Sequence, residues 1–228
     1  MKDATMNAIS YKSIFQQPFF RYLYELHNKY GVKFTLYIYA ESDKYSIEKF
    51  PVKFRKELQQ NSDWLKFGFH SIRPKFAETT MANTDSFEIA YMRVTDAITR
   101  FAGNDGMSKC LRLHYFYASK EEVGFLADKG ITTMLAADDP ERASYSLPIE
   151  AQKELHRGSY SDSIMHFLAT DMRIEKQSIS PYWDLYKHIE NDTLVIFTHE
   201  WALDRKSIKF KFGRTLQILY NSGANFVN

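Results

Sequence analysis

The sequence predicts an α/β domain whose parallel strands form a barrel or distorted barrel. Segments with the pattern of strands alternate with segments of helical spacing along all 228 residues, which favours parallel strands joined by right-handed helical crossovers. About seven strand–helix units fit this length, as in a (β/α)7 barrel. A doubly wound open sheet is the alternative, but it usually carries a glycine-rich phosphate loop, and the sequence contains none.

Seven segments have apolar residues at helical spacing and are expected to form helices. In chain order they are residues 15–30, 51–58, 86–101, 119–130, 149–156, 181–189 and 212–220. Pro18 suits the first turn of the first helix, and Gly31 ends that helix. Ser119 and Glu122 have the spacing of a capping box, and Gly130 ends the helix that they begin.

Seven segments are apolar, or rich in β-branched and aromatic residues, and are expected to form strands. In chain order they are residues 32–39, 64–71, 111–115, 131–137, 163–170, 194–198 and 224–227. The charged run 206–211 is expected to be a solvated loop or edge, with a grip on a phosphate or polyanion as the alternative. The chain has no repeat, linker or low-complexity segment, so residues 1–228 are expected to form one domain.

Composition and charge exclude several classes of site and favour none of the charged partners. A net charge of +2 gives no reason to expect nucleic acid or an anionic membrane as a partner. The single cysteine, Cys110, excludes an intramolecular disulfide and a cysteine zinc cluster. No apolar run approaches the ~20 residues of a membrane helix, and the N-terminus lacks the apolar region of a secretory signal. A cytoplasmic location is therefore expected.

Polar side chains occur at the ends of several expected strands: His70, Arg112 with His114, Asp139, Asp171 and His199. Barrels build their sites from the carboxyl ends of their strands, and converging neutral imidazoles suit a divalent metal such as zinc. An inward arginine needs a carboxylate partner, and the two aspartates are candidates for Arg112. The simpler alternatives are structural roles: His70 and His199 would each be a core histidine with its hydrogen bonds satisfied inside the protein, and Arg112 would form a structural ion pair.

Several short motifs, taken in order, resemble the polysaccharide deacetylase (NodB homology) superfamily. Residues 30–36 (YGVKFTL) are similar to the family's YGVKATFF strand, and His70 with Ser71 resembles the opening of its H-[ST]-x-x-H-P metal motif. The segment 111–115 (LRLHY) resembles R-x-P-[YW], Thr170 with Asp171 resembles the fourth motif, and 196–199 (IFTH) resembles the closing L-x-x-H.

The resemblance implies a distorted (β/α)7 barrel that removes an N- or O-acetyl group from a sugar or polysaccharide with the help of a metal. In such an enzyme a divalent metal, expected to be zinc, would be held by His70 and His114 with Asp139 or Asp171. The resemblance also implies catalytic roles for His199 as general acid, for Asp171 and for Arg112. Tyr115 and Trp201 would contact the carbohydrate substrate.

Two departures from the family leave alternatives open. The first family motif, a T-F-D-D-G strand, has no counterpart before residue 15, and Pro74 stands where a second metal histidine is expected. One alternative is an N-terminally shortened copy whose missing strand lay upstream; others are a site rebuilt from His70, His114 and another carboxylate, or a non-catalytic carbohydrate-binding relative. A broader alternative is a glycosidase with paired carboxylates such as Asp139 and Asp171. A missing first strand would leave a gap that a partner chain or the N-terminal segment fills, or that stays open and promotes self-association.

Overall fold

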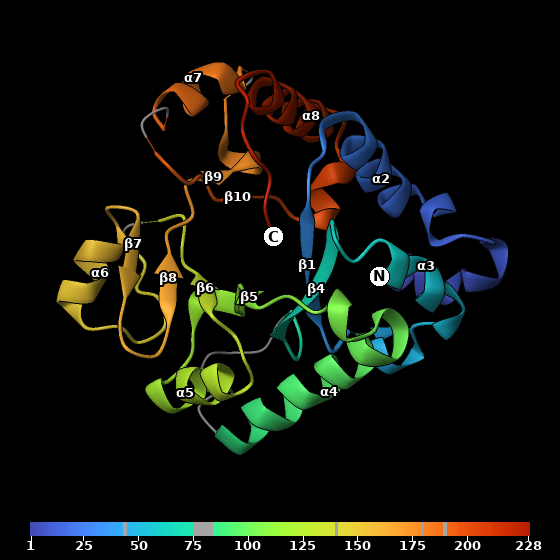
Figure 1. Cartoon of the computed structure of the whole chain (residues 1–228), viewed down its shortest axis with the longest axis horizontal. Coiled ribbons are helices and arrows are strands. Elements are labelled where there is room, and N and C mark those ends of the chain that lie inside the picture. Colours follow the sequence, from blue (N-terminus) through green and yellow to red (C-terminus); the bar gives the residue numbers. More distant parts are fainter. Residues whose placement is uncertain (43–44, 75–83, 140, 179, 189–190) are drawn as a thin grey trace.

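The structure, a computed structural model, describes residues 1–42, 45–74, 84–139, 141–178, 180–188 and 191–228. It has a mixed α/β architecture in which short strands lie inside a ring of helices (Figure 1). The expected alternation of strands and helices is therefore confirmed. Residue 189, the expected end of the helix that begins at Pro181, lies outside the described ranges.

Most of the strand pairs are parallel, as the sequence predicts. The strands are β1 (Phe34–Tyr39), β2 (Glu41–Ser42), β3 (Tyr45–Ser46), β4 (Leu65–Ser71), β5 (Cys110–Leu111), β6 (Thr133–Leu135), β7 (Ser159–Ser161), β8 (His166–Leu168), β9 (Met172–Arg173) and β10 (Ile196–Phe197). The pairs β1–β4, β5–β6, β6–β8 and β9–β10 are parallel, and the hairpins β2–β3 and β7–β8 are antiparallel. Neither hairpin was expected from the sequence.

The strands of the described residues form four small sheets and no closed barrel. One backbone bridge, between Phe67 and Met107, links β4 to the segment that precedes β5. Within the described ranges β1 pairs only with β4 and β10 only with β9. Residues of β1 and β10 line a cavity of about 2140 Å³, so each of these strands has an edge without a strand partner.

Several strands are shorter than expected because the chain turns early. After β5 the segment His114–Phe116 is a 3₁₀ turn in which Tyr115 and Phe116 both have a φ of 56°. Aromatic residues rarely adopt this left-handed conformation, so the sequence favoured a continuing strand. The expected strand at 224–227 is wrong, because these residues have no strand partner in the described part of the chain.

The helices match the expected segments with one large exception. They are α1 (Lys2–Met6), α2 (Pro18–Tyr30), α3 (Arg55–Gln60), α4 (Thr84–Ala102), α5 (Lys120–Asp128), α6 (Ile149–Leu155), α7 (Pro181–Tyr186) and α8 (Lys206–Asn221). Gly31 ends α2 with a φ of 69°, and the capping box of Ser119 and Glu122 begins α5. The expected loop at 206–211 is wrong: it forms the first turns of α8, which buries Ile208 and Phe212 four residues apart.

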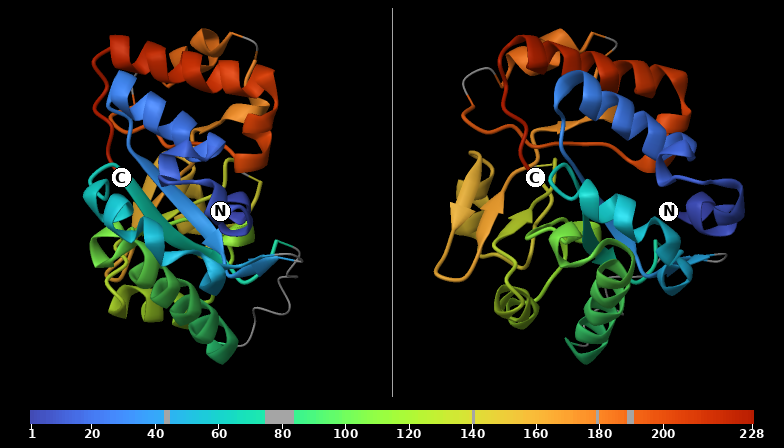
Figure 2. Two further views of the ribbon diagram at one scale, coloured as in Figure 1. Left: turned by 90° about the vertical axis from the view of Figure 1, so that its right-hand side faces the viewer. Right: turned by 45° about the vertical axis from the view of Figure 1, so that its right-hand side comes forward.

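Aromatic side chains fill two apolar clusters. In the larger one, Phe101 of α4 packs against Phe50 and Phe67, with ring centroids 4.5 and 5.2 Å away. The smaller one lies between α2 and α8, which run beside each other (Figure 2). Phe212 of α8 reaches Phe34 of β1 there, with ring centroids 6.3 Å apart. Much of the aromatic content therefore serves the core.

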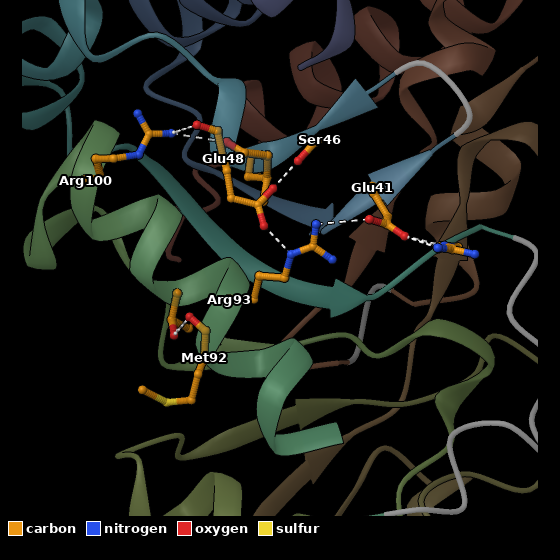
Figure 3. Close-up of polar contacts among 9 residues, drawn as sticks. Glu41, Ser46, Glu48, Met92, Arg93 and Arg100 are labelled. Atoms are coloured by element: carbon orange, nitrogen blue, oxygen red, sulfur yellow. Dashed lines mark hydrogen bonds and ion pairs between the residues drawn. The ribbon is translucent and has the colours of Figure 1, made fainter. Parts of the chain in front are cut away.

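Charged side chains attach α4 to the β2–β3 hairpin (Figure 3). Arg93 of α4 forms ion pairs with Glu41, at 3.0 Å, and with Glu48. About two turns further along the same helix, Arg100 donates to the carbonyl oxygens of Ile47 and Glu48, at 3.3 and 2.7 Å. Two arginines of α4 thus connect the long helix to the hairpin and to the residues just after it: Arg93 through two carboxylates and Arg100 through two backbone carbonyls.

Candidate active site

Three histidines that the sequence singled out lie at or just after the ends of different strands. His70 is the last residue but one of β4, His114 follows β5, and His199 follows β10. The rings of His70 and His114 are 5.2 Å apart between centroids. His70, Arg112 and His199 line the cavity, so the strand ends bring together much of the polar set that the sequence singled out.

His70 is a neutral acceptor. Its Nδ1–H donates to the carbonyl oxygen of Arg112, which leaves the lone pair on Nε2. Burial lowers the pKa of His70 to about 3 against the opposing effect of that hydrogen bond, and the permanent positive charge of nearby Arg112 lowers it further. Among the described residues none forms a hydrogen bond with Nε2. His70 can therefore accept a hydrogen bond from a donor in the cavity.

His114 uses both ring nitrogens. Its Nε2 lies 3.1 Å from the carbonyl oxygen of Pro74, and its Nδ1 lies 2.9 Å from the hydroxyl of Tyr39. A carbonyl oxygen only accepts, so Nε2 carries the proton and Nδ1 accepts from Tyr39. Burial lowers the pKa of His114 and keeps the ring neutral. A metal ion could bind this imidazole only after one of the two hydrogen bonds is lost.

The expected metal ligands do not form a set. Asp139 is exposed in a turn, where its carboxylate accepts from the amide of Glu141 at 3.1 Å. Across the ranges that the structure describes, no three His, Cys, Asp or Glu side chains are grouped so that they could hold a metal ion. The described residues therefore do not fit the expected zinc.

Arg112 is buried, with only 6% of its surface exposed, and lacks the expected carboxylate partner. Its Nη1 donates to the hydroxyl of Thr170 at 2.7 Å and to the carbonyl oxygen of Ala136 at 3.3 Å. The guanidinium carbon lies 3.6 Å from the ring centroid of Phe197 and 4.5 Å from that of Phe116. Neither expected aspartate contacts it, and within the described ranges its hydrogen-bond partners are neutral groups.

Asp171 lies at the beginning of the β9–β10 pair, away from His199. Its carboxylate accepts from the backbone amide of Val195 at 2.7 Å and from the side chain of Asn191 at 3.0 Å. Because β9 and β10 are parallel, these contacts are at the start of β10, whereas His199 follows its end. The structure thus separates two of the residues that the sequence grouped as catalytic.

Glu175, which the sequence did not indicate, is the partner of His199. One of its oxygens, Oε1, accepts from the amide of His199 at 2.7 Å, from its Nδ1 at 3.0 Å and from the hydroxyl of Thr198 at 3.1 Å. Burial would raise the pKa of Glu175, but the hydrogen bonds from His199 outweigh it and lower the pKa to about 2. Glu175 is thus a carboxylate that holds the Nδ1–H tautomer of His199 and leaves Nε2 as the basic nitrogen.

The strand register explains this pairing. Ile196 is opposite Met172 and Phe197 is opposite Arg173, and the 3₁₀ helix Ile174–Lys176 that follows β9 then places Glu175 against the backbone just after β10. One pattern could have revealed the pair: an acidic residue two positions after one strand, and a histidine two positions after its parallel neighbour. It was missed because β9 is only two residues long and was not expected as a separate strand.

The two aromatic residues expected at the substrate are near the histidines. Trp201 is 59% exposed, lines the cavity and stacks on His199 with ring centroids 5.3 Å apart. Tyr115 is 39% exposed, and its ring lies 4.0 Å from that of His114. The guanidinium of Arg205 also lies near this ring, 5.5 Å from the Trp201 centroid.

Comparison with known proteins gives no assignment, since no family model matches the sequence and none of the curated proteins matches it. No helix in the described parts of the chain is long and apolar enough to cross a membrane.

Proposed function

We propose that the protein is a carbohydrate deacetylase-like hydrolase that uses His199 as its acid–base residue and Glu175 to orient it. The observation that carries the proposal is the hydrogen bond from His199 Nδ1 to Glu175, with His199 lining the cavity beside the exposed Trp201. A positioned histidine with a buried carboxylate is a common arrangement for general acid–base catalysis. The proposal includes a distorted (β/α)7 barrel whose described strands are divided among separate small sheets, and a cytoplasmic location.

In this proposal His199 transfers one proton twice. Its Nε2 accepts a proton from water while the water oxygen bonds to the acetyl carbonyl carbon. His199 then donates that proton to the sugar nitrogen or oxygen as the bond to the carbonyl carbon breaks, which releases acetate and the free amine or alcohol. Glu175 offsets the positive charge that the ring carries between the two transfers.

His70 has a supporting role here. Its Nε2 can accept a hydrogen bond from the attacking water and so orient it. With a pKa of about 3, His70 does not hold a proton near neutral pH, so it does not replace His199 as the base.

A non-catalytic carbohydrate-binding protein is the second candidate. One observation favours it: both nitrogens of His114 are engaged by Tyr39 and Pro74, so the resemblance to a metal-dependent deacetylase is not matched by a ligand set. In that case Trp201 and the cavity would bind a sugar, and the His199–Glu175 pair would serve only the local structure.

Acetate release from chitin-type oligosaccharides tests the proposal. The wild-type protein is expected to release acetate, and His199→Ala is expected to lower turnover by about 10²–10⁴-fold while its Tm changes little. His156→Ala is the matched control, because His156 is exposed beyond the end of α6. Binding without acetate release would favour the second candidate, and neither binding nor release would refute both.

A further inference from the structure

We propose that Arg112, with the rings of Phe116 and Phe197, forms a binding subsite for the carboxylate group of a small ligand in the cavity. Arg112 lines this cavity although it is nearly buried. The proposal concerns binding alone and does not depend on catalysis by His199.

The contacts of Arg112 leave the edge that binds carboxylates available. Both of its hydrogen bonds use Nη1, which donates to Thr170 and Ala136. Nε and Nη2, which lie along the opposite edge of the planar group, have no hydrogen-bond partner among the described residues. Arg112 lines the cavity, so a ligand there would approach its side chain. Two parallel N–H groups on one guanidinium edge match the two oxygens of a carboxylate.

The surroundings hold this edge in place. The carbonyl of Ala136 also accepts from the hydroxyl of Thr170, at 2.5 Å, so the anchor of Nη1 is itself fixed. The rings of Phe197 and Phe116 contact the guanidinium at 3.6 and 4.5 Å and restrict its rotation. A ligand therefore meets an arginine whose donors are already oriented, which lowers the entropy cost of binding.

The charge of Arg112 is balanced only in part by its described neighbours: Asp138 attracts it but forms its ion pair with another residue. Asp138 is paired with Lys176 at 2.7 Å, and Glu175 is occupied by His199 and Arg173. The adjacent His70 is neutral near neutral pH. A buried cation without an anion is costly, and aromatic rings and neutral acceptors compensate for it only in part. An anionic ligand would supply the missing charge.

Charge and shape favour a carboxylate over a phosphate. The available edge belongs to one guanidinium with a single positive charge, and the other nearby cations, Lys176 and Arg173, already have carboxylate partners. A monoanionic, planar carboxylate balances that charge with two parallel hydrogen bonds. A phosphate dianion would bring a second charge into a largely buried site without a partner.

Isothermal titration calorimetry with D-glucuronate and its neutral amide, D-glucuronamide, tests the inference on the intact protein. The wild type is expected to bind glucuronate at least tenfold more tightly than glucuronamide, because only the carboxylate accepts charge-assisted bonds from both N–H groups. Equal binding of the two sugars, or tighter binding of inorganic phosphate, would overturn the proposal. This comparison needs no variant.

Two variants and a control locate the site. Arg112→Gln is expected to weaken glucuronate binding about tenfold to a hundredfold. Arg112→Lys keeps the positive charge but loses the pair of parallel N–H donors, so its affinity for glucuronate is expected to lie between those of Arg112→Gln and the wild type. Arg142→Gln is the matched control: Arg142 is exposed 5.2 Å from the same Phe116 ring and is expected to leave binding within about twofold. Unchanged binding in a folded Arg112→Gln or Arg112→Lys protein, or an equal loss in Arg142→Gln, would contradict the inference.

Discussion

Replacing Glu175 by glutamine is expected to destabilise the protein by about 2–3 kcal/mol at pH 7. The pKa of Glu175 falls from 4.5 to about 2 on folding, which corresponds to about 3 kcal/mol of favourable interaction with the ionised form. The side chain is only 7% exposed, so solvent screens these interactions little. Glutamine keeps the shape and one acceptor oxygen, and it therefore retains part of the bonding to His199 and Thr198.

The pH dependence provides the sharper test. Because the pKa of Glu175 is lower in the folded state, its contribution is complete above about pH 4.5 and is lost as the pH falls towards 2. Urea unfolding from pH 7 down to pH 3.5 should show the difference between wild type and Glu175→Gln shrinking by roughly half. Asp139→Asn is the control, since Asp139 is exposed. A loss below about 0.5 kcal/mol at pH 7, or a constant difference across this range, would refute the reasoning.

Three further substitutions test other contacts, each by urea unfolding. Arg93→Met should cost about 0.5–1 kcal/mol at pH 7 and less towards pH 2, because the depressed pKa of Glu48, about 2, depends on its pair with this partly exposed arginine; a pH-independent loss would contradict this. Gly68→Ala should cost about 1–3 kcal/mol, since its Cβ would lie 2.9 Å from Leu111; an unchanged stability would show that β4 and β5 can adjust. Ser119→Ala should cost about 1 kcal/mol by removing the α5 cap, and a neutral effect would mean that water replaces the hydroxyl.

Local rules predicted the elements whose signals lie within one or two turns of chain. Gly31 and the Ser119 capping box acted where expected, because left-handed caps and side-chain caps are determined by the residues themselves. The run 206–211 was misread because its four polar or charged residues hide the spacing between Ile208 and Phe212. The two aromatic residues at positive φ after β5 could not be predicted, since only tertiary contacts can maintain that conformation.

The histidines of the candidate site could be predicted from the sequence, but their hydrogen-bond partners could not. Strand ends in an α/β fold converge, so His70 and His199 at one cavity follow from the sequence order. Their hydrogen-bond partners depend on strand register and on which strands are neighbours. The pairing of Glu175 with His199 depends on a two-residue strand pair, which no periodicity in the sequence marks.

The β10 strand links the two parts of the cavity. Phe197 stacks on Arg112, and His199, two residues on, faces Glu175. Since side chains alternate along a strand, a slip of one residue would turn Phe197 away from Arg112 and His199 away from Glu175 together. Asp171 holds the amide of Val195 at the start of β10, and Glu175 holds the amide of His199 after its end. These two carboxylates therefore fix the register of a strand too short to fix its own, and with it the acid–base pair and the stacked arginine.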